Sequence, residues 1–275
     1  LVVPHAGYIY SGWVAAYGYK TLINQDIKRV ILIGNSHRDY FDGASVYPEG
    51  YYKTPLGNVE IDADFVKKLM AKNDKISYHE TADSEEHSLE VQLPFLQRVL
   101  PVSGWKIVPI IIGNQAGAAD ILINALKDLI DDNTLLIASS DLSHYPKYED
   151  AKYSDNKVIE AILTGKRENL RKTISELEAE NIPNLQTCAC GHDAIEVVMS
   201  LMEGKNAKLL KYANSGDVSI GDKSQVVGYA AIAFSSKKTD DELGLAEQKR
   251  LLEIAKETVE TYIREGKTID IKESM

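Results

Sequence analysis

The chain has 275 residues, of which 44% are hydrophobic and 26% are charged. This is enough for one large or two small domains with a buried core, and it excludes a disordered, collagen-like or coiled-coil protein. The net charge of −10 argues against nucleic acid or an anionic lipid surface as a partner, because their phosphates would be repelled. The longest apolar runs are far shorter than the roughly 20 residues of a bilayer-spanning helix, so we expect no membrane span.

The chain contains two cysteines, Cys188 and Cys190. They are one residue apart, which would strain a bridge between them, and two cysteines cannot form a disulfide framework. We therefore expect a reducing, cytoplasmic setting. The first four residues (LVVP) lack the features of a secretory leader and read as a chain that opens inside a strand.

Apolar runs rich in β-branched residues alternate with helical patterns along the chain, which is typical of an α/β domain. The sequence predicts strands over residues 1–3, 29–34, 105–112, 134–139, 209–213 and 226–234. It predicts helices over residues 12–23, 63–72, 89–100, 116–130, 149–164, 168–180 and 191–203, with a kink or restart at Pro94. The predicted fold class is three-layer α/β, with a central mixed, largely parallel sheet between helices.

The character of the sequence changes near residue 237. Charges of both signs then dominate, and the apolar residues follow one amphipathic helical pattern that Gly266 ends. We predict an α/β domain over residues 1–236, followed over residues 237–275 by a linker and one long helix. That helix cannot form a core alone, so it either packs on the first domain or begins an incomplete second one.

Three of the six histidines each follow an apolar strand. His5 follows residues 1–3, His37 follows residues 29–34, and His144 follows residues 134–139. Ligands bind at the carboxyl edge of an open α/β sheet, because the loops there surround a crevice. If the three strands are parallel neighbours, the three imidazoles meet in one cleft, although any single histidine at such a position is more often an ordinary loop residue.

Cys190 is the natural fourth member of this group, because it directly precedes the predicted helix over residues 191–203. A helix amino terminus stabilises a thiolate, the form that binds metal. Two imidazoles and a thiolate suit iron, copper or zinc, and an open coordination position would make the site catalytic. The alternative is that a small cysteine is simply buried, which we expect for Cys188.

Several neighbouring residues have both a functional and a structural interpretation. Asp141 and His144 form a candidate acid–base pair, but Asp141 also suits the cap of a turn. Glu86 and His87 are candidates for supporting the ligands or transferring a proton, but acids also occur at helix amino termini without function. Tyr8 and Tyr10 suit the rim of a cleft that binds a phenolic small molecule or a tyrosine-containing peptide, or ordinary packing. Nucleotide-binding glycine motifs, the serine nucleophile elbow and the paired histidines of zinc proteases are absent from the sequence.

Six motifs, taken in order, resemble the Memo family. They are residues 4–12 (PHAGYIYSG), 34–37 (GNSH), 52–57 (YKTPLG), 86–90 (EHSLE), 139–144 (SSDLSH) and 190–191 (CG). The resemblance covers residues 1–234 and implies the fold of the class III extradiol ring-cleaving dioxygenases. It also implies a metal bound by His5, His37 and Cys190, with Cys190 where those dioxygenases have a glutamate. His144 then takes the place of the acid–base histidine, with Asp141 beside it.

The segment after residue 237 resembles the opening helix of an AMMECR-type domain, which implies a functional link to AMMECR-type and radical-SAM proteins. The main hypothesis is a metal-dependent oxidoreductase with a mononuclear centre. By resemblance its metal is iron(II), with copper or zinc as alternatives. A soft thiolate in place of a hard carboxylate changes the metal preference, so ring cleavage itself transfers poorly. The other hypotheses are a binding module that uses the cleft without turnover, and a zinc hydrolase.

Overall fold

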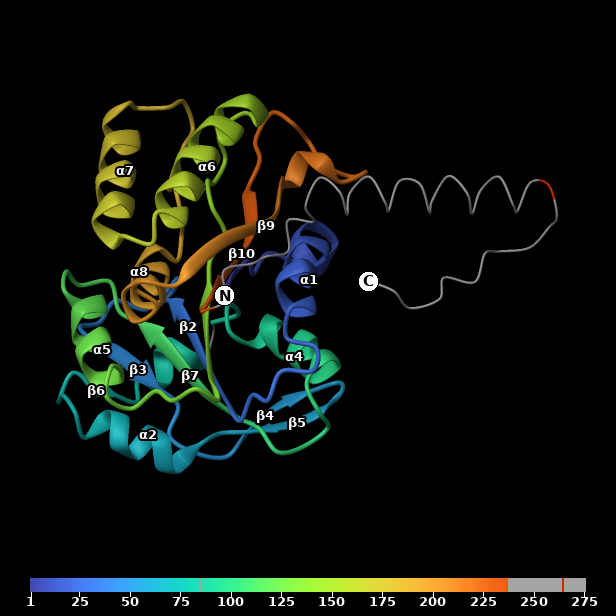
Figure 1. Cartoon of the computed structure of the whole chain (residues 1–275). Coiled ribbons are helices and arrows are strands. Elements are labelled where there is room, and N and C mark those ends of the chain that lie inside the picture. The colour runs from blue at the N-terminus through green and yellow to red at the C-terminus, as the bar shows by residue number, and fades with distance from the viewer. Residues whose placement is uncertain (85, 237–263, 265–275) are drawn as a thin grey trace. The chain divides into compact units, whose positions relative to one another are not determined.

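The structure is a computed structural model that describes residues 1–84, 86–236 and Arg264 (Figure 1). The α/β unit of the chain spans Leu1–Phe234. The predicted linker and helix over residues 237–275 lie outside the described residues, apart from Arg264. No helix in the described part of the chain combines the length and the apolar character needed to cross a membrane.

Eight strands form the main sheet, in the order β6-β3-β7-β2-β8-β1-β10-β9. Strands β7, β2, β8 and β1 are parallel to one another. On either side of these four, β3 is antiparallel to β7 and β10 is antiparallel to β1. The predicted mixed, largely parallel sheet is therefore confirmed. The strands are β1 (Val2–Val3), β2 (Arg29–Asn35), β3 (Ala44–Val46), β6 (Ile76–Ser77), β7 (Lys106–Ile112), β8 (Thr134–Ser139), β9 (Asn206–Asn214) and β10 (Gly228–Ser235), and a separate hairpin comprises β4 (Tyr51–Thr54) and β5 (Gly57–Glu60).

Helices cover both faces of this sheet. Helices α5 to α8 lie together on one side, and α1 and α4 lie on the other (Figure 1). This arrangement confirms the predicted three-layer architecture. The helices are α1 (Trp13–Lys20), α2 (Ala63–Met70), α3 (Glu80–Ser84), α4 (Leu93–Val99), α5 (Ala118–Leu126), α6 (Tyr148–Leu163), α7 (Arg167–Ala179) and α8 (His192–Leu201), with a π-helical turn η1 (Tyr8–Gly12) and 3-10 turns η2 (Glu90–Gln92) and η3 (Ser215–Asp217).

The predicted helix over residues 89–100 is divided in two. The 3-10 turn η2 comes first, and α4 then begins with Pro94 in its first turn. A proline costs little there, because the first N–H groups of a helix have no intrahelical partner. Pro94 therefore restarts the helix, which is one of the two outcomes predicted from the sequence.

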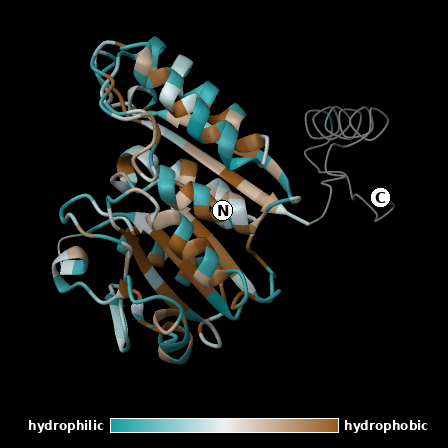
Figure 2. Cartoon of the chain, turned by 90° about the vertical axis from the view of Figure 1, so that its left-hand side faces the viewer, coloured by the Kyte–Doolittle hydropathy of each residue, from teal (hydrophilic) through white to brown (hydrophobic). Residues whose placement is uncertain are grey.

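The core is centred on β2 and β7, whose residues Val30–Ile33 and Ile107–Val108 are almost completely buried. Figure 2 shows this as apolar strands enclosed by helices with polar outer surfaces. Strands covered on both faces are continuously apolar, which is why the sequence predicts them well. The sequence does not predict β3 and β6, because two or three residues carry no periodicity, or the β4–β5 hairpin, whose residues are mostly exposed.

Candidate metal centre

The topology brings the three strand-end histidines to one edge of the sheet. Strands β2, β8 and β1 are parallel neighbours, so their carboxyl ends point the same way. His37, His144 and His5 follow these ends, in that order across the sheet. The three histidines therefore gather where three parallel strands meet their loops, as the sequence predicts.

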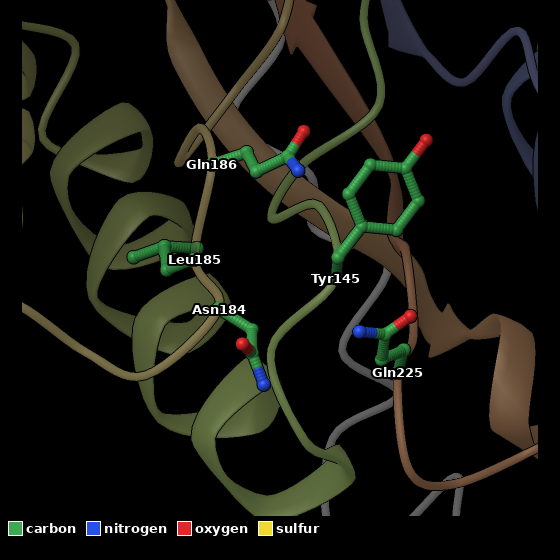
Figure 3. Close-up of a pocket in the computed structure, with 5 residues that line it drawn as sticks. All are labelled: Tyr145, Asn184, Leu185, Gln186 and Gln225. Atoms are coloured by element: carbon green, nitrogen blue, oxygen red, sulfur yellow. The ribbon is translucent and has the colours of Figure 1, made fainter.

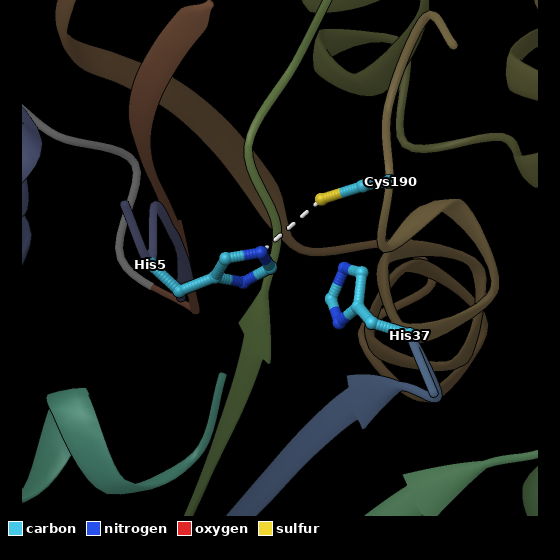
Figure 4. A group of neighbouring side chains, drawn as sticks. All are labelled: His5, His37 and Cys190. Atoms are coloured by element: carbon cyan, nitrogen blue, oxygen red, sulfur yellow. Dashed lines mark hydrogen bonds between the residues drawn. The ribbon is translucent and has the colours of Figure 1, made fainter. Parts of the chain in front are cut away.

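His5, His37 and Cys190 come together at this edge of the sheet (Figure 4). Each offers one ligand atom, and the three atoms lie within 4.8 Å of one another. The closest pair is Cys190 Sγ and His5 Nε2, 3.3 Å apart. His5 is buried, whereas a quarter of the His37 side chain is exposed, so the group is open to solvent on one side.

Backbone contacts between β8 and the start of α8 place Cys190. Its N–H lies 3.3 Å from the Asp141 carbonyl, and the N–H of Gly191 donates to Ser140 Oγ at 2.9 Å. A Cβ at position 191 would lie 2.5 Å from the Ser139 carbonyl oxygen, so only glycine permits this close approach. The thiol is thus held against the end of β8.

The protonation of Cys190 differs from the sequence expectation. Burial raises the pKa of the thiol well above its usual range, and the Asp141 carboxylate raises it further. Although α8 begins only two residues later, its dipole does not outweigh this desolvation in the metal-free protein. A bound cation reverses the balance, because a coordinating thiol is deprotonated.

Glu86 holds His37 from behind. Its carboxylate accepts the backbone N–H of His37 at 2.9 Å and lies 3.1 Å from the ring Nδ1. Burial alone would raise the pKa of Glu86, but bonds from the His37 ring and from the N–H groups of Ser88 and His37 lower it to about 2. An ionised carboxylate only accepts, so Nδ1 carries a ring proton and Nε2 is the nitrogen that could bind a metal.

The predicted pairing of Asp141 with His144 takes a different form. Asp141 Oδ1 accepts the backbone N–H groups of His5 at 2.9 Å and Ala6 at 3.2 Å. Among the described residues, no hydrogen bond joins its carboxylate to the His144 ring. Asp141 therefore fixes the loop that carries His5, and its effect on His144 is electrostatic: it raises the pKa that burial lowers.

His144 points a free nitrogen at this site. Its Nε2 is buried and has no hydrogen-bond partner in the described structure. Ligand atoms of His144, Asp141 and Cys190 lie within 4.8 Å of one another. Its backbone is fixed on both sides by bridges to Thr187 and Val227. An unpartnered buried imidazole nitrogen beside a metal-binding group is placed to take or give a proton.

Of the three other residues predicted near the site, only His87 contacts the candidate ligands. The His87 ring lies 5.4 Å from that of His5 and 5.5 Å from that of His37, with its side chain half exposed. Tyr8, in η1, is exposed and donates its hydroxyl to the Val91 carbonyl at 3.0 Å. Tyr10 is partly buried in the small apolar cluster around Val14 and does not stand free at the rim.

A pocket of about 340 Å³ lies beside Tyr145, the residue that follows His144 in the chain (Figure 3). Its lining has three carboxamides and a phenol but no charged group: Tyr145, Asn184, Leu185, Gln186 and Gln225. The ring of Tyr145 contacts that of His144 edge-on, with 5.5 Å between centroids. Tyr145 has φ 70°, an unusual conformation for a non-glycine residue, and such strain clusters at functional sites.

Sequence reasoning missed the buried polar residues that support the ligands. Gln92 and Ser139 lie behind His5, and Asn35 joins the end of β2 to Asp193 and Ala194 in the first turn of α8. A polar residue between Val91 and Leu93 in an apolar helical pattern was the one available signal for Gln92. Ser139 and Asn35 carry no local signal, because their partners are distant in sequence.

Comparisons with known proteins identify the family and the fold of the chain. The family model described as Memo-like protein matches residues 1–233. A MEMO1 family protein from Methanopyrus kandleri is 38% identical over 85% of this chain and 82% of its own length, and one from Thermoplasma acidophilum is 40% identical over 84% and 83%. An uncharacterized protein from Escherichia coli K12 shares the fold, with a TM-score of 0.51 and 16% identity over 78% of this chain and 91% of its own. The chain belongs to the Memo-like protein family.

Proposed function

We propose that this protein is a metal-dependent oxidoreductase that acts on a small molecule in the cleft at the carboxyl edge of β2, β8 and β1. His5, His37 and Cys190 would hold one transition metal ion, iron(II) first by resemblance, with copper and zinc as the alternatives. The observation that carries the proposal is the convergence of these three side chains, with ligand atoms within 4.8 Å of one another.

The donor set fits a metal. Burial lowers the pKa of His5 to about 4, against an opposing effect of Asp141, so the ring is neutral at pH 7 as a ligand must be. His37 is held by Glu86 with its Nε2 free. The metal-free thiol is buried beside a carboxylate, and a cation would neutralise the thiolate that coordination creates.

The bound metal would supply a Lewis acid with open positions and, as iron or copper, electrons for oxygen chemistry. The chain's own residues do the rest. His144 moves a proton at its unpartnered Nε2, with the Asp141 carboxylate favouring the protonated ring. The pocket beside Tyr145 holds the part of the substrate that does not react, and its uncharged hydrogen-bonding lining suits a neutral polar or phenolic molecule.

The test is the metal content of protein purified without oxygen after supply of iron, copper and zinc. We expect about one transition metal ion per chain, lost in Cys190→Ala because two imidazoles alone bind weakly. Cys188→Ala is the matched control, since this second cysteine is also buried but is not among the candidate ligands. We expect it to keep its metal.

The outcome separates the hypotheses. Metal-free protein under these conditions would contradict the proposal, and zinc as the metal would favour a hydrolase. Loss of turnover with retained metal in His144→Ala would support the proton-transfer role. The link to AMMECR-type and radical-SAM proteins and the cytoplasmic setting stay predictions.

A further inference from the structure

A buried chain of hydrogen bonds reaches His5 from the opposite side to the cleft. It consists of Tyr19 in α1, Gln92 in η2 and Ser139 at the end of β8, each at most 1% exposed. Tyr19 Oη lies 2.7 Å from Gln92 Oε1, Gln92 Nε2 lies 2.9 Å from Ser139 Oγ, and Ser139 Oγ lies 3.0 Å from His5 Nδ1. We call these three residues the Gln92 relay.

The orientation of the Gln92 amide follows from its neighbours. Its Nε2 lies 3.1 Å from the Pro4 carbonyl oxygen and 3.4 Å from that of Ser88. Carbonyl oxygens only accept, so the NH₂ group must face them and Oε1 must face Tyr19. Tyr19 therefore donates its proton to Gln92. The flat stacking of Tyr19 on Phe95, with 4.9 Å between centroids and 3° between ring planes, holds the phenol in place.

Matching donors to acceptors in the same way fixes the direction of the Ser139 hydroxyl hydrogen. Its Oγ lies 2.6 Å from the Ser88 carbonyl oxygen, a distance that requires the hydroxyl hydrogen between them. Ser139 has no second hydrogen, so it accepts from both Gln92 Nε2 and His5 Nδ1. His5 therefore carries its ring proton on Nδ1, and its Nε2, which faces Cys190 Sγ at 3.3 Å, keeps a free lone pair.

We propose that Ser139 is a positioning residue that sets the tautomer of His5, so that Nε2 is always presented as the ligand atom, and that Gln92 holds Ser139 in this place. The inference rests on the proposed metal centre, whose other histidine is set by a charged group, Glu86. A neutral relay does for His5 what a carboxylate does for His37. It adds no second negative charge next to His5, whose Nε2 already lies 3.9 Å from Asp141 Oδ2.

Removing the relay has a predictable direction. Without the Ser139 hydroxyl, the nearest acceptors for a ring proton of His5 are on the other side, Cys190 Sγ at 3.3 Å and Asp141 Oδ2 at 3.9 Å. The proton then moves to Nε2, where it occupies the lone pair that the metal needs. A metal ion must then displace this proton from Nε2 before it can bind.

The test measures the tautomer and the metal affinity separately. In metal-free protein with ¹⁵N-labelled histidine, protonated and bare ring nitrogens resonate far apart, and a His5→Gln variant assigns the His5 signals. We expect Nδ1–H in the unaltered chain and a shift toward Nε2–H in Ser139→Ala, with a smaller shift in Gln92→Met, where Ser139 keeps its bond to the Ser88 carbonyl. Titration with Co²⁺ should show affinity about 10–100-fold lower in Ser139→Ala.

Ser45→Ala is the matched control. Ser45 is an equally buried serine on β3 whose hydroxyl contacts Asp83 and the His79 backbone, so its loss should leave both the His5 tautomer and the Co²⁺ affinity unchanged. A His5 proton that stays on Nδ1 in Ser139→Ala overturns the inference. Should Gln92→Met not fold, Ser139→Ala decides, since it removes a single hydroxyl.

The failure of the metal proposal would look different. If the unaltered chain bound no Co²⁺, the metal centre would be wrong, while the ring spectrum of the metal-free protein would still decide the relay. A shifted tautomer without any change in Co²⁺ affinity would overturn the claim that the relay serves metal binding.

Discussion

Asp155 in α6 is a carboxylate with no exposed surface that supports the loop between β8 and His144. Its Oδ1 accepts the backbone N–H of Ser143 at 2.9 Å, and its Oδ2 accepts the Tyr212 hydroxyl at 2.8 Å. Burial raises its pKa to about 6, although these hydrogen bonds act in the opposite direction. Ionised Asp155 therefore holds the residue next to His144 at a cost in stability.

This predicts a pH dependence of unfolding that one substitution removes. A carboxyl whose pKa is higher in the folded than in the unfolded chain binds more protons when folded, so its contribution to stability falls as pH rises through both pKa values, from about 4 to about 6. A shift of about 2 units corresponds to roughly 3 kcal/mol. In Asp155→Asn the free energy of unfolding should not show this fall between pH 4 and pH 7, as measured by urea unfolding at the two pH values. An equal fall in both proteins would contradict the assignment.

Residue types predicted the candidate ligands but not what holds them. His5, His37 and Cys190 stand out because few side chains bind transition metals and because each has a marked place beside a strand or helix. Gln92 and Ser139 are common residues whose role depends on partners up to 134 positions away. They are identified by matching hydrogen-bond donors to acceptors around His5 in the folded structure. The sequence alone does not show which donors and acceptors are neighbours.

At the scale of elements, the seam between β8 and the start of α8 decides where Cys190 lies. The close approach at Gly191 and the bonds of Asn35 to the first turn of α8 join this helix to the ends of two central strands. Metal affinity therefore depends on helix docking as well as on the ligands.

Gly191→Ala tests this seam. Its Cβ would lie 2.5 Å from a backbone oxygen that has no freedom to move aside. We expect a loss of about 1–3 kcal/mol in the free energy of unfolding, as for other overpacked sites, with weakened binding of Co²⁺. Gly7→Ala is the control, because its Cβ would meet only the Tyr10 ring at 3.9 Å. Stability and Co²⁺ affinity equal to those of the unaltered chain would contradict the close-packed seam.

At the scale of the whole molecule, the candidate metal centre exists only in the folded chain. Its proposed ligands come from positions 5, 37 and 190, which folding brings together from the ends of β1 and β2 and from the segment before α8. A metal that binds the folded but not the unfolded chain stabilises the fold by mass action.

Metal should therefore raise the unfolding temperature. At a free concentration of 100 times the Kd, the gain is about 2.7 kcal/mol. Scanning calorimetry with and without Co²⁺ should show this shift in the unaltered chain and in Cys188→Ala, but not in Cys190→Ala. A similar shift in Cys190→Ala would mean that the metal binds elsewhere.

The sequence by itself determined the central strands, most helices and the three-layer class, because apolar periodicity is local and the buried parallel strands are continuously apolar. It also placed three histidines at strand ends. The tertiary structure established that β2, β8 and β1 are neighbours, that Asp141 hydrogen-bonds the His5 loop and acts on the His144 ring only through its charge, and that Gln92 lies behind Ser139 and His5. These three features depend on the order of the strands and on hydrogen bonds between residues distant in the sequence. The local sequence pattern constrains neither of them.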